Sequence, residues 1–114
     1  MKILVAIPCL TGPNHVKEAI ESVINRKDVD VLICANGADS DVRAVINKYI
    51  GVVGVILTSN PTNIYVNPVW NQFLDFFIHN DDKYSHLIIM NSDIIMQKNW
   101  RYVFIYMGGI ITAI

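Results

Sequence analysis

The stretch that decides the fold is Lys2–Leu10, KILVAIPCL, in which an unbroken apolar run ends at Pro8. A run of Ile, Leu, Val and Ala without polar alternation is typical of a strand buried on both faces, as the strands of parallel sheets are. A second run of this kind, His86–Met90, is followed by the polar triplet Asn91-Ser92-Asp93. Strands of this type need helices over both faces, so these runs predict an α/β domain.

Between these two runs, strand-like and helix-like segments alternate. Further short strands are predicted at Asp30–Cys34 and Val52–Leu57, and helices at 14–25, at Asp41–Tyr49 and from Pro68 to about Phe77. Asn14 is expected to cap the first helix, and Pro68 suits the first turn of the third. This alternation predicts a three-layer, open, mostly parallel sheet of the Rossmann-like type. Beyond it, Gln97–Tyr106 is compatible with a short helix and Gly109–Ile114 with a fifth strand.

Length and composition bound the possible functions. The 114 residues amount to one domain, and 53% hydrophobic against 17% charged residues argues against disorder. A net charge of −1 gives no general attraction to nucleic acid. No apolar stretch approaches the roughly 20 residues that span a bilayer, and the N-terminus is unlike a signal peptide. We therefore expect a cytoplasmic domain without a membrane span.

Polar residues gather where the predicted strands end. In open parallel sheets ligands bind beyond the carboxyl ends of the strands, so the loops to weigh are 8–14, 35–41, 59–67 and 91–93. Neither of the glycine-rich phosphate-binding patterns occurs, which argues against a standard dinucleotide site or P-loop. Asp93, leaving an apolar strand, is the best candidate ligand for Mn²⁺ or Mg²⁺, which prefer oxygen donors. An Asn-x-Asp triplet taken alone is also typical of a capped turn.

The order of these segments resembles the nucleotide-binding half of a GT-A glycosyltransferase of the inverting family 2. KILVAIPCL resembles that family's opening strand, and VKEAIESVIN its first helix. VLICANGADSD is similar to the strand and turn that hold the nucleoside, and Asn63–Asn71 to the Asn-x-Gly…Asn stretch before the third helix. HLIIMNSDII resembles the strand ending in the Asp-x-Asp or Asn-x-Asp metal motif.

The resemblance implies that the chain binds a nucleotide-diphosphate sugar and, if active, transfers the sugar with inversion to the hydroxyl of an unknown acceptor. It assigns the metal to Asp93. The residues implied in binding the nucleotide sugar are Pro8, Leu10, Asn36, Gly37, Asn71, Asn91 and Ser92.

Two features depart from the family pattern. Ala35 stands where the family usually has an aspartate that contacts the nucleoside. Only 21 residues follow Asp93 and none is acidic, so we expect the acceptor half to be absent, and the catalytic base is not identifiable.

Alternative interpretations remain open. The chain can be a truncated, non-catalytic nucleotide-sugar-binding domain. It can also be a flavodoxin-like or redox module, with Cys9 and Cys34 near the ends of two strands. His15, His79 and His86 are interpreted as structural or surface residues and Trp70 as a core residue, whereas Trp100 is as compatible with an acceptor site as with the core.

The C-terminal segment predicts an interaction surface. Without an acceptor half to cover it, an apolar patch or sheet edge is expected to be exposed there. We therefore expect self-association, or a partner that covers this segment. The residues concerned are Val103, Phe104, Ile105, Ile110 and Ile111.

Overall fold

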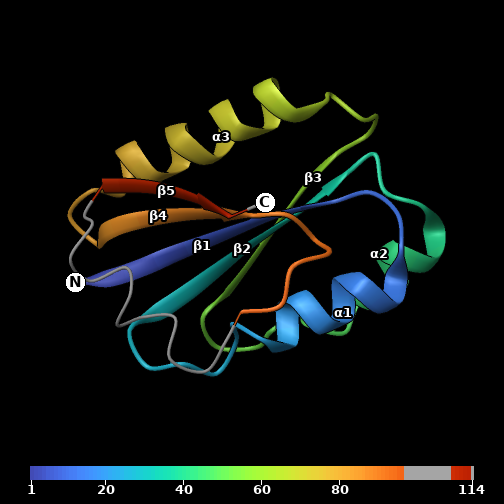
Figure 1. Ribbon diagram of the computed structural model, residues 1–114, viewed down its shortest axis with the longest axis horizontal. Helices are drawn as coiled ribbons and strands as arrows, with labels where there is room; N and C mark the ends of the chain where they lie inside the picture. Colours follow the sequence, from blue (N-terminus) through green and yellow to red (C-terminus); the bar gives the residue numbers. More distant parts are fainter. Residues whose placement is uncertain (97–108, 114) are drawn as a thin grey trace.

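The chain folds as one parallel sheet with helices on both faces (Figure 1). The computed structural model describes residues 1–96 and the backbone of residues 109–113. Its strands are β1 (Lys2–Cys9), β2 (Val29–Asn36), β3 (Val55–Asn60), β4 (Tyr84–Met90) and β5 (Gly109–Ala113). Its helices are α1 (Pro13–Glu21), α2 (Ser40–Asn47) and α3 (Val66–His79). The strand order is β3-β2-β1-β4-β5, and every neighbouring pair is parallel.

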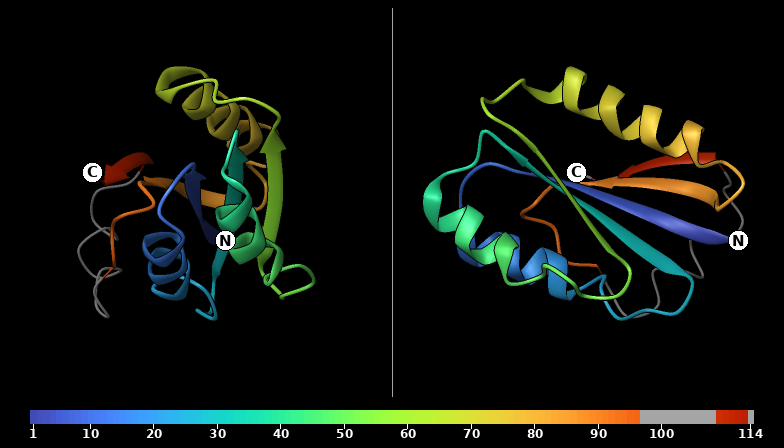
Figure 2. Two further views of the ribbon diagram at one scale, coloured as in Figure 1. Left: turned by 90° about the vertical axis from the view of Figure 1, so that its right-hand side faces the viewer. Right: turned by 180° about the vertical axis from the view of Figure 1, so that it is seen from behind.

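The sheet separates two apolar cores. Ile3, Val5 and Ile7 of β1 point toward α1 and α2, whereas Leu4 and Ala6 point toward α3, because successive side chains of a strand alternate between faces. Figure 2 shows α1 and α2 together on one side of the sheet and α3 alone on the other. The predicted α/β class, with a parallel sheet flanked by helices, is confirmed and is compatible with a Rossmann-like open sheet.

A buried carboxylate, that of Asp30, links three strands of the sheet near the ends at which they begin. Asp30 is 3% exposed and lies 3.1 Å from the Lys2 ammonium and 3.3 Å from that of Lys83, while the Tyr84 hydroxyl donates to it at 2.7 Å. Burial alone would raise the pKa of Asp30, but these hydrogen bonds and the Lys2 charge together hold the pKa below its ordinary value. One side chain on β2 thus connects β1 with the start of β4.

The third strand begins three residues later than predicted. Residues 51–54 form a turn in which Gly51 and Gly54 both have φ of 81°, and β3 then pairs with β2 from Val31–Val55 to Asn36–Asn60. Ser59 and Asn60, which were predicted in a loop, therefore belong to the strand, because pairing with β2 outweighs the polarity of their side chains. The fifth strand is confirmed, whereas the helix expected at Gln97–Tyr106 lies outside the described residues.

Two predictions about helix ends are wrong. Asn14 does not cap α1: Gly12, with φ of 74°, is the N-cap, and Pro13 occupies the first helical position. The helix ends at Glu21 rather than near Asn25: turns follow it, and Asn25 has a left-handed φ of 58°, which an α-helix cannot continue through. Pro68 does lie in the first turn of α3, as predicted. In the part of the chain that the structure describes, no helix is both long and apolar enough to cross a membrane.

The strand order also determines where a ligand can bind. From β1 the chain continues through α1 to β2, whereas β4, on the other side of β1, is reached through α3 on the opposite face. Crossovers on opposite faces leave a crevice at the carboxyl ends of the two central strands. In this chain the crevice lies between the ends of β1 and β4, beside Pro8 and Asn91.

Candidate functional site

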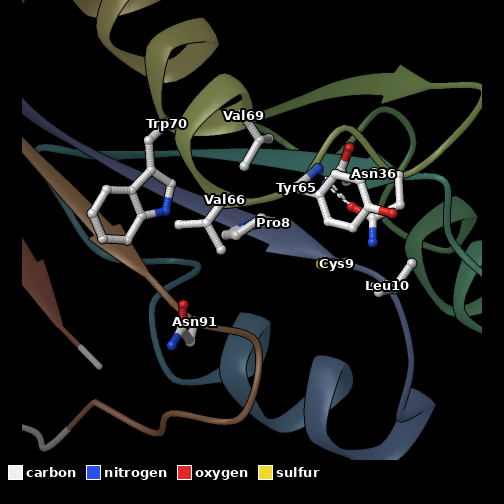
Figure 3. A pocket seen from close by; sticks show the side chains of 10 residues that line it. Pro8, Cys9, Leu10, Asn36, Tyr65, Val66, Val69, Trp70 and Asn91 are labelled. Atoms are coloured by element: carbon white, nitrogen blue, oxygen red, sulfur yellow. Dashed lines mark hydrogen bonds between the residues drawn. The ribbon is translucent and has the colours of Figure 1, made fainter.

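Two adjoining cavities open at this crevice. The first, called here the apolar cavity, has a volume of about 190 Å³ and is lined by Pro8, Cys9, Leu10, Asn36, Asn63, Tyr65, Val66, Val69, Trp70 and Asn91 (Figure 3). The second, called here the polar cavity, has a volume of about 550 Å³ and is lined by Pro8, Thr11, Gly12, His15, Asn91, Ser92 and Asp93. Because Pro8 and Asn91 line both, the two cavities are neighbours and are treated together as the candidate site.

The apolar cavity is built between α3 and the end of β1. In Figure 3 Val66 and Pro8 lie between Trp70 at one end and Tyr65 near Asn36 at the other. Val69 is buried beneath them, whereas Trp70 is half-buried and also packs against the core cluster under α3. Aromatic and aliphatic walls with a few amides are typical of a site for a small, flat, partly apolar group.

A network of amide side chains holds the wall of this cavity. Asn36, 5% exposed, donates to the Asn63 side-chain oxygen at 3.0 Å. Its own oxygen accepts from the Asn60 amide at 3.1 Å and from the backbone N–H of Ile64 at 3.2 Å. Asn60 in turn exchanges two hydrogen bonds with Gln72 of α3. The network ties the end of β2 to the loop before α3, so the role of Asn36 in this structure is to position that loop.

Gly37 also helps to position the loop before α3. Its φ is 65°, and a Cβ at this position would overlap the backbone of Thr62 and Asn63. A glycine is therefore required here both by the backbone conformation and by the close approach of the loop. Gly37 shapes the apolar cavity without lining it.

The polar cavity brings together groups from two elements. Thr11, Gly12 and His15 come from the β1–α1 loop and the first turn of α1, whereas Asn91, Ser92 and Asp93 follow β4. Among the described residues lining it, only Asp93 is acidic, and its side chain is exposed. No group of three or more His, Cys, Asp or Glu side chains able to hold a metal ion occurs in residues 1–96.

This donor set still fits one kind of metal site. Mg²⁺ commonly binds through one or two carboxylates and completes its shell with water and substrate phosphate. Asp93 supplies one carboxylate, and the Asn91 and Ser92 side chains supply neutral oxygens in the same cavity. The residues therefore suit a cation that arrives with a phosphorylated ligand rather than one held by protein alone.

The structure gathers most of the residues singled out from the sequence. Pro8, Leu10, Asn36 and Asn91 line the apolar cavity, and Ser92 and Asp93 line the polar one. Asn71 is exposed on α3 and lines neither of the two cavities.

Several lining residues were missed or interpreted differently. Trp70, interpreted as a core residue, and Tyr65 both line the apolar cavity, and His15, interpreted as a structural or surface residue, lines the polar one. Helical spacing placed Trp70 on the inner face of α3 but did not reveal that a cavity adjoins this face. No sequence motif marks Tyr65 or His15.

The two cysteines lie on opposite faces of the sheet. Cys9 belongs to the core under α1 and α2 and Cys34 to the core under α3, and both are free and buried. Burial, together with the charge of Cys34, raises the pKa of Cys9 to about 12, and burial raises the pKa of Cys34 despite a hydrogen bond from Thr58. Reactive cysteines need a thiolate, so these features do not favour redox chemistry.

Comparison with known proteins adds no assignment to this geometry. No protein-family model matches the sequence, and no curated protein is significantly similar to it. The chain is thus an α/β domain with two adjoining cavities at the carboxyl edge of a parallel sheet.

Proposed function

We propose that this chain is a GT-A-type domain that binds a nucleotide-diphosphate sugar together with Mn²⁺ or Mg²⁺. The nucleoside occupies the apolar cavity, and the diphosphate extends into the polar cavity toward Asp93. The observation that carries the proposal is that an apolar and a polar cavity adjoin at Pro8 and Asn91, at the carboxyl edge of the sheet. Ligands of open α/β sheets bind at this edge, and the resemblance of the five sequence segments assigns the same loops to the donor.

The side chains divide the task between them. Trp70, Val69 and Pro8 cover the apolar part of the ligand, while Asn36 and Asn63 hold the loop that completes the wall. Ser92 and Asn91 offer hydrogen bonds to phosphate oxygens, and Asp93 holds the cation. A cation held there would neutralise the charge of the diphosphate and so make it a better leaving group.

Transfer with inversion would need one more group. A base must deprotonate the acceptor hydroxyl while the hydroxyl oxygen attacks the anomeric carbon in line with the departing diphosphate. A carboxylate on a dication is a poor base, and Asp93 is the sole acidic side chain among the described residues of the two cavities. This observation favours a second candidate function, a non-catalytic domain that binds the same donor.

Two measurements test these proposals. Calorimetric titration of uridine diphosphate, with and without manganese, is expected to give saturable binding that the metal strengthens. An assay for donor hydrolysis or sugar transfer then separates the two candidates: turnover supports the transferase, and binding without turnover supports the binding domain. The absence of binding for the diphosphates of uridine, guanosine, cytidine and adenosine would contradict both.

A further inference from the structure

Tyr65 has a backbone conformation that is unusual for its side chain. Its φ is 68° and its ψ is −177°, a region that is essentially restricted to glycine. The conformation is held from both sides: the Tyr65 N–H donates to the Asn63 side chain at 2.8 Å, and its carbonyl accepts from the Val69 N–H in the first turn of α3. The fold therefore holds a tyrosine where glycine would relieve strain.

Packing in the core does not offset this strain. Tyr65 is 73% exposed, so its ring gains little from burial in the folded chain. The ring lines the apolar cavity at the end near Asn36, opposite Trp70 (Figure 3). An exposed aromatic ring that lines a cavity, on a backbone held in a strained conformation, is placed to contact something that enters the cavity.

We propose that Tyr65 is a base-binding residue, whose ring stacks on the planar heteroaromatic base of the nucleotide in the apolar cavity. This inference rests on the proposed function and adds the side chain that recognises the base. Stacking suits the site because a tyrosine ring offers a flat apolar face with a polar tip, and every nucleobase has a π-face. The fixed backbone sets the direction in which the Tyr65 side chain leaves the chain, toward the apolar cavity that it lines.

The test compares stability with affinity in the same variants. Tyr65→Gly removes both the ring and the strain, so its melting temperature is expected to be equal to or above that of the parent chain. Its affinity for uridine diphosphate and for uridine is expected to fall by the same factor, roughly tenfold, because the lost contact is with the base. Tyr65→Phe is expected to keep both stability and affinity, and pyrophosphate with manganese is expected to bind all forms equally.

Asn25→Gly serves as the matched control, since Asn25 also has a positive φ, 58°, and lines neither of the two cavities. It is expected to leave the affinity unchanged. Tyr65→Leu keeps an apolar side chain without a flat ring. If the glycine variant does not fold, the affinity of the leucine variant for uridine diphosphate shows whether the ring contributes to binding.

The outcomes separate the two proposals. If the parent chain binds none of the four nucleoside diphosphates, the proposed function fails and the role of Tyr65 fails with it. If the parent chain binds one of them and the Gly and Leu variants bind it equally well, the role of Tyr65 alone is overturned.

Discussion

At the scale of single residues, Asp93 is the side chain on which the proposed metal binding depends. Asp93→Asn is expected to weaken the manganese-dependent binding of uridine diphosphate about tenfold or more, because the amide carries no charge to balance the dication. Calorimetric titration measures the effect. Uridine alone is expected to bind unchanged.

Asp75→Asn, an exposed position on α3 outside both cavities, is the matched control for this variant. Equal affinities of the Asp93 and Asp75 variants for uridine diphosphate in manganese would contradict the assignment of the metal to Asp93.

Asp30 leads to a prediction about acid stability. Its folded-state pKa lies below the ordinary value of 3.8, so on acidification the unfolded chain takes up the proton first. The contribution of Asp30 to stability is therefore complete above about pH 5 and is lost as the pH falls through and below that ordinary value. Asp30→Asn is expected to cost about 2 kcal/mol at neutral pH and to flatten the acid limb of the stability curve.

Urea denaturation between pH 7 and pH 3 measures both effects. Asp82→Asn, exposed just before β4, is the control and is expected to follow the parent chain. If the free energy of unfolding of the Asp30 variant fell between pH 7 and pH 3 as steeply as that of the parent chain, other carboxylates would be responsible for the loss of stability in acid.

At the scale of elements, Gly37 and Gly51 form a natural pair. Both have positive φ, 65° and 81°, but a Cβ at Gly51 meets nothing within 4 Å, whereas one at Gly37 overlaps the loop before α3. Gly51→Ala is expected to cost about 1 kcal/mol from the backbone alone. Gly37→Ala is expected to cost at least about 2 kcal/mol more and to weaken nucleotide binding, because the loop carrying Asn63 must move.

Denaturation midpoints of the two alanine variants, at equal slopes, give the difference directly. Similar losses of unfolding free energy at both positions would mean that the loop before α3 moves without an energetic penalty. The amide network would then not hold the cavity wall in place.

The comparison of sequence with structure is most instructive at this scale. The apolar runs of β1 and β4 and the helical spacing of α3 could be predicted, because burial imposes a pattern that one element carries within itself. The bounds of β3 could not, since the pairing of Val55 with Val31 and of Asn60 with Asn36 depends on a neighbouring strand. The same limit applies to the site: Asp93 follows directly from the strand before it, whereas Tyr65 and His15 enter the site only through the arrangement of separate elements.

At the scale of the whole molecule, the two edges of the sheet differ. The edge strand β3 ends with the polar residues Thr58, Ser59 and Asn60. The opposite edge, β5, has the largely apolar sequence Gly-Ile-Ile-Thr-Ala, and no further strand pairs with it among the described residues. A sheet edge of this composition favours association with a second chain or a partner.

We therefore expect self-association. Sedimentation velocity over a range of concentrations up to tens of micromolar is expected to reveal a dimer or a larger species. A single monomeric species at every concentration would contradict this prediction.

The wall shared by the two cavities, Pro8 and Asn91, has a thermodynamic consequence. A molecule with one part in each cavity binds its second part at the high effective concentration set by a short covalent connection. When the two halves are supplied as separate molecules, neither raises the affinity for the other. Each then loses its own translational and rotational entropy on binding. Weak separate affinities for a nucleoside and for a diphosphate would thus be compatible with firm retention of the intact molecule.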